Sequence, residues 1–231
     1  MEGLSTEELN ILIENNKRSF NGNFIYDGIV DISEYKNSDL KVLWILKEAN
    51  SPDNYDWDMR DALLNLKNES GKGLKYGWAN TFTPIVYTTY GIFNGQLWQN
   101  IESFNENQSI IDVLRKVAYI NVKKVPGNSI SNWQEIKAYY DENKKALHEQ
   151  IKIIKPNIII FGNTLGFFDA DFFELFGDLK VNKENNSLHI YENNQYLLLH
   201  AYHPNNRNIT QKEYCDSIIE SVNEWKKSCL K

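Results

Sequence analysis

The sequence predicts an α/β protein, a three-layer sandwich in which a central, mostly parallel sheet of four strands has helices on both faces. Three short apolar runs end abruptly in polar residues: VLWILKEAN over residues 42–50, VAYINVKKVPG over 117–127 and LLLHAYHPNNR over 197–207. Continuous apolar runs of this kind are typical of buried parallel strands. Helical patterns alternate with them, which favours parallel strands joined by helical crossovers.

The chain length fits one domain. With 231 residues the chain can bury a substantial core, and no linker or internal repeat divides it. Residues 1–231 are therefore predicted to form a single domain, with residues 1–40 as a helical or irregular extension packed on it.

Capping residues, apolar periodicity and turn residues place the predicted elements along the chain. Ser5 followed by Glu8 has the form of a capping box at a helix start. Lys155-Pro156 stops the longest helical pattern, because proline cannot continue a helix from its interior. In chain order, the predicted elements are a helix (4–20), irregular chain (22–40), a strand (42–46), a helix begun by Asp56 or Asp58 (to Leu66), a loop (68–80), a stretch left open between helix and irregular structure (81–101), a short helix (110–116), a strand (117–122), a helix (133–154), a strand (158–161), a helix (165–175), a hairpin (180–181 with 188–191), a strand (196–200) and a helix (210–226).

Composition and charge narrow the function classes. The formal net charge is −6, which argues against tight, non-specific binding to duplex nucleic acid but leaves room for a local basic groove. Cys215 and Cys229 have no partners at metal-ligand spacing, so free thiols in a reducing cytoplasm are expected. No apolar run approaches about 18 residues, and the first residues lack a signal-peptide pattern. A cytoplasmic protein with no membrane partner is predicted.

Polar side chains follow each predicted strand where it ends, and open α/β sheets bind ligands at that edge. These side chains are Glu48, Asn121, Asn163 and His203. Each also has an interpretation without function. Glu48 can be an exposed loop residue, and Asn121 can be an asparagine that forms hydrogen bonds to the backbone at a strand end. Gly162 either brings backbone amides near an anion or lets a strand and a helix pack closely.

The sequence lacks the common cofactor and metal motifs. There is no GxxxxGK[ST], GxGxxG or GxSxG pattern, so chemistry on nucleoside triphosphates or dinucleotides has no support. His200 and His203 lie close together, but no carboxylate or third histidine follows at a spacing that would complete a zinc site. We therefore predict neither a metal nor a cofactor.

Four segments, in this order, resemble motifs of the uracil-DNA glycosylase superfamily. VLWILKEANSP resembles the first motif, with Glu48-Ala49 on the Glu-Ala pair of the branch that reads Gly-Glu-Ala-Pro-Gly. VAYINVKKVPG resembles the strand whose asparagine, here Asn121, reads uracil. IKPNIIIFGNTL resembles the segment of helix, Lys-Pro, strand and glycine. HPNNRN resembles the second motif, His-Pro-Ser-Pro, in which His203 is the histidine, and the similarity covers roughly residues 40–225.

The resemblance implies a uracil-DNA glycosylase-like fold and hydrolysis of the N-glycosidic bond of uracil or a related damaged base in DNA. The base would enter a pocket from single-stranded or distorted DNA, since its bond is not reachable in a stack. Glu48 would position water, Asn121 would read the base, and His203 would hydrogen-bond the departing base. Further residues expected at the site are Ala49, Asn50 and Asn163 near the base, Trp78 and Phe82 as candidates for stacking on it, and Arg207, Lys123 and Lys124 on the DNA, extended into a basic rim by Arg115, Lys116, Lys72 and Lys75.

Departures from the family's motifs leave other functions open. Lys47 replaces the usual glycine of the first motif and Asn50 its proline, while Asn205-Asn206 replaces Ser-Pro. A lysine at position 47 can crowd the pocket or pair with Glu48, and such a pair would favour loss of hydrolysis. The alternative is a non-catalytic or divergent member that binds a nucleobase or small nucleotide as a sensor or sequestering module, which the negative net charge also favours. A plain interaction domain is the third reading.

Overall fold

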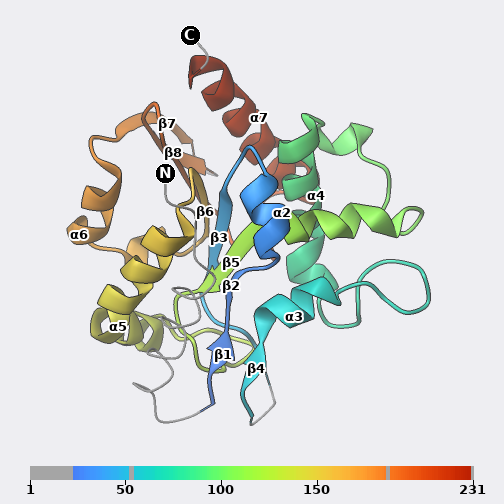
Figure 1. Cartoon of the computed structure of the whole chain (residues 1–231), viewed down its shortest axis with the longest axis horizontal. Helices are drawn as coiled ribbons and strands as arrows, with labels where there is room; N and C mark the ends of the chain where they lie inside the picture. Colours follow the sequence, from blue (N-terminus) through green and yellow to red (C-terminus); the bar gives the residue numbers. More distant parts are fainter. Residues whose placement is uncertain (1–22, 52–54, 186–187, 230–231) are drawn as a thin grey trace.

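The structure, a computed structural model, describes residues 23–51, 55–185 and 188–229, and the helix predicted over residues 4–20 lies outside them. The described residues form an α/β fold in which a mixed seven-stranded sheet is packed with helices (Figure 1). In spatial order, the strands of this sheet are β2 (Gly28–Ile29), β5 (Val117–Asn121), β3 (Val42–Leu46), β6 (Ile158–Gly162), β9 (Leu197–Ala201), β8 (Leu188–Glu192) and β7 (Lys180–Asn185).

The four central strands β5, β3, β6 and β9 are parallel to one another, and all four were predicted. Every residue of β3, β5 and β6 is buried, as expected for strands that are covered on both faces. The predicted sheet of four strands is too small. The antiparallel strand β2 joins one edge through β5, and the predicted hairpin β7–β8 joins the other through β9.

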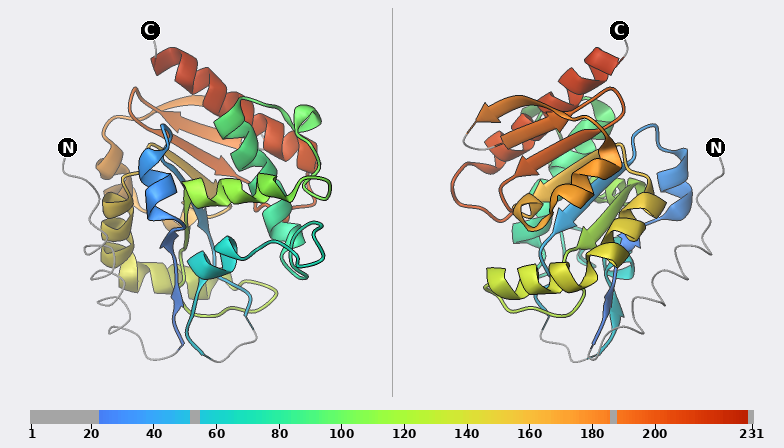
Figure 2. Two further views of the ribbon diagram at one scale, coloured as in Figure 1. Left: turned by 45° about the vertical axis from the view of Figure 1, so that its right-hand side comes forward. Right: turned by 90° about the vertical axis from the view of Figure 1, so that its left-hand side faces the viewer.

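Helices cover both faces of the sheet (Figure 2). Alternate residues of a strand point to opposite faces, so the sheet separates two apolar clusters. Trp44 and Leu46 belong to the cluster of α4 (Ala79–Asn94) and α7 (Gln211–Cys229), and Ile45 to the cluster of α5 (Trp133–Ile154). The remaining helices are α2 (Ile32–Asn37), α3 (Met59–Leu64) and α6 (Ala170–Phe173), with the 3₁₀ helices η1 (Trp98–Asn100), η2 (Gln108–Lys116), η3 (Leu165–Phe167) and η4 (Glu174–Phe176).

Local signals explain the ends of the helices. Asp58, one of two predicted capping residues, accepts the backbone N–H of Arg60 and begins α3. The prediction for α5 is confirmed at both ends: Asn132 caps it, and Lys155 ends it in the left-handed region, with φ of 52°. Proline at the next position prevents the helix from continuing.

Two stretches differ from the predictions, and a third was left open. Residues 22–40, predicted to be irregular, contain β1 (Ile25–Tyr26), β2 and α2, and β1 pairs in parallel with β4 (Trp57–Asp58). The helix predicted over 165–175 is broken into η3, α6 and η4, because Phe167, Phe168 and Phe172 turn into the α5 cluster and packing overrides helix propensity. Residues 81–101, left open, form most of α4 and η1. Among the described residues, no helix is long and apolar enough to cross a membrane.

The register of the parallel strands sets a row of residues at their carboxyl ends. Asn121 pairs with Leu46, and Gly162 pairs with Ala201. Leu46 also lies beside Gly162, because the preceding residues of β3 and β6 are paired. The row faces the cluster of α4 and α7, since Leu46 and Ala201 belong to it. Asn121 is the one polar side chain in this row.

Candidate functional site at the carboxyl end of the sheet

Asn121 places a buried amide at the end of β5. The residue is 1% exposed, and within the described chain neither the oxygen nor the nitrogen of its side-chain amide has a hydrogen-bond partner. Buried polar side-chain atoms usually have partners, and leaving one unpaired costs roughly 1–3 kcal/mol. An amide offers one acceptor and two donors. The site is therefore complementary to a ligand that presents an adjacent donor and acceptor.

Aromatic rings lie on the same face of the sheet, beside Asn121. Tyr119 precedes Asn121 by two residues, and its ring centroid is 5.6 Å from that of Phe82. Phe82 is 5.2 Å from Trp78, which packs edge-on against Trp57 at 6.4 Å. Phe82 is buried in the core, whereas Trp78 is half-buried. Of the two predicted stacking residues, Trp78 is thus the more accessible one.

Glu48 follows β3, and its carboxylate is held in one place. The ammonium of Lys123 lies 2.6 Å from Oε2 of Glu48. The side chain of Glu48 is 3% exposed, and that of Lys123 is 12% exposed. Lys123 also lies 3.7 Å from Glu135, in the first turn of α5. Gly127 packs against the carboxylate, since a Cβ at that position would be 2.1 Å from Cδ of Glu48. Glu48 therefore has a partner, but it is Lys123 and not Lys47.

Lys47 is close to His203 instead. Burial, with a smaller contribution from the charge of Lys47, lowers the pKa of His203 to about 4, so the imidazole is neutral at pH 7. Its Nδ1 accepts the backbone N–H of Asn205 at 3.1 Å. The proton of the neutral ring is then on Nε2. His203 can offer an N–H to a ligand without carrying a charge.

Lys124 extends in another direction and is buried. Its ammonium lies 2.7 and 2.8 Å from the two carboxylate oxygens of Asp27, and its side chain is 6% exposed. The same carboxylate accepts the backbone N–H of Asn121 at 2.7 Å and Nε2 of Gln150 at 2.9 Å. Burial lowers the pKa of Lys124, and the charge of Asp27 opposes this effect. The predicted contact of Lys124 with DNA does not fit this position.

The turn after β6 has a packing role. A Cβ on Gly162 would lie 2.5 Å from Cδ2 of Leu46 and 3.1 Å from Cδ of Pro204, so close packing explains this glycine. Asn163 is exposed, with φ of 60°. Its backbone N–H donates to the carbonyls of Phe161 and Ala201. This N–H is therefore not aimed at an anion, and Asn163 contributes to the site only through its exposed side chain.

The remaining predicted residues divide between the two ends of the sheet. Ala49 is buried, its carbonyl accepting the N–H of Gly127, while Asn50 is exposed at the same bridge. Arg207 is exposed in the loop after β9. Arg115 and Lys116 precede β5 and lie at the end opposite Asn121. They cannot belong to a basic rim around the site.

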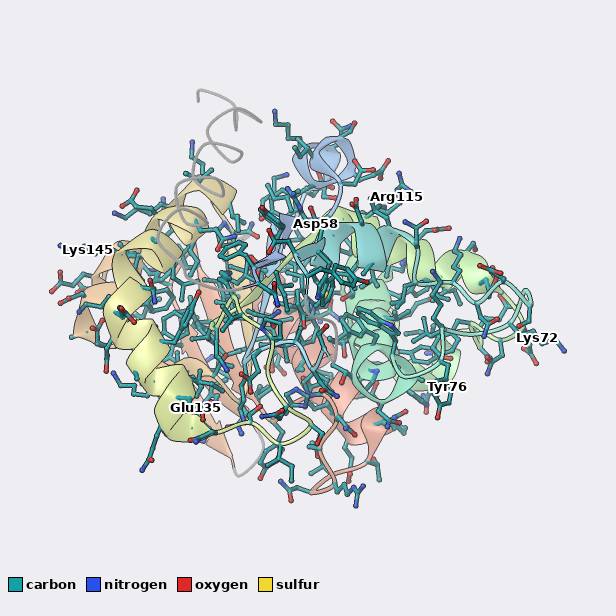
Figure 3. All side chains as sticks on the ribbon, turned by 90° about the horizontal axis from the view of Figure 1, so that it is seen from below. Asp58, Lys72, Tyr76, Arg115, Glu135 and Lys145 are labelled. Atoms are coloured by element: carbon teal, nitrogen blue, oxygen red, sulfur yellow. The ribbon has the colours of Figure 1, made fainter. Side chains whose placement is uncertain are left out.

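Large apolar side chains are exposed around the carboxyl end. Tyr55, Tyr76 and Ile130 come from the loops that follow β3 and β5 or precede α4, and Trp133 begins α5. They are four of the five most exposed large apolar residues in the described chain. Lys72 and Tyr76 point outward from the loop before α4, across this end of the molecule from Glu135 (Figure 3). Aromatic and basic side chains in such loops are suited to flat, anionic partners.

The alternatives to this site in the described chain would be a cavity at the amino end of the sheet or a metal-binding cluster. A cavity of about 460 Å³ at the amino end of the sheet is lined by Lys41, Lys152 and Lys155 together with apolar side chains. The ammonium of Lys41 donates to the carbonyls at the end of α2, and Lys152 pairs with Glu149. No group of three or more His, Cys, Asp or Glu side chains in the described chain is arranged to hold a metal ion.

Sequence reasoning missed Asp27, Gln150 and Gly127. Gly127 carried a signal, because Pro-Gly marks the turn after β5, but nothing local indicates that it faces Glu48. Asp27 lies 94 positions from Asn121 and 123 from Gln150, and no short-range pattern records such contacts. A comparison with protein-family models finds no match, and neither does a comparison with curated proteins.

Proposed function

We propose that the protein is a DNA base-excision enzyme with a uracil-DNA glycosylase-like fold, which hydrolyses the N-glycosidic bond of uracil or a related damaged base. The observation that carries the proposal is the amide of Asn121, buried and without a partner in the described chain, at the carboxyl end of a parallel strand. Glu48 follows β3, next to β5, and His203 follows β9, two strands beyond β3, at the same end of the sheet. No cofactor is needed for this reaction.

The amide of Asn121 suits the edge of a base that presents a carbonyl beside a ring N–H, as uracil and hypoxanthine do. Leu46, Gly162 and Ala201 complete the row across the sheet and supply an apolar surface beside it. Trp78, which packs against Phe82 and through it against Tyr119, would be the ring that stacks on the base. A base would thus be read at its edge by one polar group among apolar neighbours, as in most small-molecule sites.

His203 and Glu48 would act on the bond. A neutral His203 with its proton on Nε2 can donate to a base that leaves as an anion, and preorganised donors of this kind are worth about 3–4 kcal/mol in catalysis. Glu48, fixed by Lys123 and Gly127, can orient water and face positive charge on the sugar. Arg207 and the exposed side chains of the loops would contact DNA.

Binding of a small nucleobase or nucleotide without hydrolysis is the second candidate. Lys123 neutralises Glu48 in the structure, which weakens the carboxylate as a partner for a cationic sugar. The predicted basic rim is also reduced, since Lys124 is buried and Arg115 and Lys116 lie at the other end. A net charge of −6 favours a small ligand over a long DNA contact.

The test is a base-release assay at low salt on single- and double-stranded oligonucleotides that carry uracil, hypoxanthine, xanthine or oxidised pyrimidines. We expect release by the native protein and a loss of about 100-fold or more in Glu48→Gln and His203→Ala. Glu149→Gln, a carboxylate change at the exposed end of α5, is the matched control and should keep full activity.

Two outcomes would redirect the proposal. Full activity in both site variants would remove Glu48 and His203 from the mechanism. No release by the folded native protein would favour the second candidate, and thermal shifts with free nucleobases and nucleotides would then detect binding, because a ligand stabilises the state that it binds.

A further inference from the structure

Residues 24–28, which we call the clasp, connect the two loops that carry the site. The N–H of Phe24 donates to Oδ1 of Asp56, in the loop that follows β3, at 2.8 Å. The N–H of Ile25 donates to the carbonyl of Lys124, in the loop that follows β5, at 2.7 Å. The clasp also supplies β1 and the start of β2, and Figure 1 shows β1 and β4 side by side at the lower end of the molecule.

Asp27 lies at the centre of the clasp and takes the place of a backbone group in the sheet. The pairing of β2 with β5 begins at Gly28 and Tyr119. The next N–H along β5 on this side, that of Asn121, donates to the carboxylate of Asp27 at 2.7 Å. Gly28 has φ of 139°, a backbone conformation open mainly to glycine, so the chain can turn here and direct Asp27 toward β5.

The carboxylate of Asp27 is itself held from two further directions. Lys124 binds both of its oxygens, and Gln150 reaches it from α5. All four residues in this network are buried. The side-chain amide of Asn121, by contrast, has no hydrogen bond within the described chain. The position of that amide is therefore set through the backbone of Asn121, and Asp27 is the group that fixes this backbone.

We propose that Asp27 is a positioning residue for Asn121, with Lys124 and Gln150 as its supports. The inference rests on the proposed function, in which Asn121 reads the base. Asp27 touches no reacting atom. It holds the end of β5 so that the amide meets its ligand, and displacements of about 1 Å at such a group cost on the order of 100-fold in rate.

The experiment compares two double variants that both remove the buried charges. Asp27→Asn/Lys124→Met keeps an oxygen acceptor for the N–H of Asn121, whereas Asp27→Leu/Lys124→Met lacks one. Asp169→Asn is the matched control, because it removes the charge of a second carboxylate network, in which Lys144 and Tyr140 of α5 donate to Asp169. The readouts are hydrogen exchange at the backbone amide of Asn121 and base release per folded molecule.

In the leucine double variant, we expect exchange at Asn121 to be about tenfold faster or more and base release to fall about 10- to 100-fold. The asparagine double variant should recover most of the protection of the Asn121 amide and most of the base release. The control variant should change neither the exchange at Asn121 nor the base release. When Asn121→Ala is added to the leucine double variant, the combined loss should be smaller than the product of the two separate losses, since residues that act as one unit are not additive.

Several outcomes would contradict either the positioning role of Asp27 or the proposed function. Unchanged exchange at Asn121 in the leucine double variant, or equal losses in both double variants, would overturn it. Faster exchange in a protein whose native form releases no base would refute the proposed function and leave the hold of Asp27 on Asn121 standing. If the leucine double variant does not fold, Gln150→Met removes one support alone, and unchanged exchange at Asn121 in that variant would also overturn the inference.

Discussion

Lys123 and Lys124 are neighbours in the sequence, and each pairs with a carboxylate, but the two ion pairs occupy different environments. Strand β5 lies between β2 and β3. Lys123 reaches Glu48, beyond the end of β3, and Lys124 reaches Asp27, before the start of β2. The first pair also has an exposed third member, Glu135, whereas the second is enclosed by Gln150 and the backbone of β5.

This difference separates the charge pair of the proposed site from the pair that we propose as its support. The carboxylate of Asp27 is bonded by Asn121, Lys124 and Gln150, which are all buried, so these contacts fix its position. The side chain of Glu48 is also buried, but that of its partner Lys123 is 12% exposed and reaches Glu135, which is 61% exposed, so the lysine end of this pair meets solvent. Chemistry requires some freedom at the site, and a fixed strand end behind it supplies the geometry.

The largest difference between the two ion pairs is expected when each lysine is removed in turn. Lys124→Met should lower the free energy of unfolding by about 3–5 kcal/mol, because it leaves the Asp27 charge buried without a counter-charge. Lys123→Met should cost about 1–3 kcal/mol, since the lysine lies at the more exposed side of its pair and water can take its place beside Glu48. Urea unfolding with linear extrapolation measures both. Equal losses would mean that the two pairs are equally enclosed.

His203 provides a pH-dependent test of how enclosed this end of the sheet is. Its pKa is lowered from 6.5 to about 4 on folding, so the unfolded chain binds more protons between these values and stability rises with pH across this window. Acidification from pH 6.5 to 4 should remove about 1–3 kcal/mol through this residue. His203→Gln should flatten that part of the stability curve, and an unchanged curve would show that His203 is more accessible than the structure indicates.

The smallest change in stability is expected at Asn121. Asn121→Leu keeps the backbone N–H that Asp27 accepts and replaces an amide that has no partner in the described chain. The free energy of unfolding should stay constant or rise by up to about 1 kcal/mol, while base release or nucleobase binding is lost. Unfolding curves and the base-release assay on the same sample measure both, and a loss of more than about 2 kcal/mol would instead assign the amide a structural role.

The parallel strands were predictable because each carries its own continuous apolar run, and burial on both faces leaves that signature in consecutive residues. Glu48, Asn121 and His203 were predicted at the carboxyl ends, and the structure places them there. The clasp was not predictable, since strands of two residues have no periodicity to detect. The burial of Lys124 was also hidden, because adjacent lysines look alike until β2 and β3 are known to flank β5.

The contacts of Asp27 also have a consequence for the order in which the protein is made. Asp27 is synthesised early, but its partners Asn121, Lys124 and Gln150 lie 94, 97 and 123 positions later. Closing loops of this length is slow relative to local structure. The first strands and helices can begin to fold on the ribosome, but this network cannot fix the end of β5 until α5 has emerged.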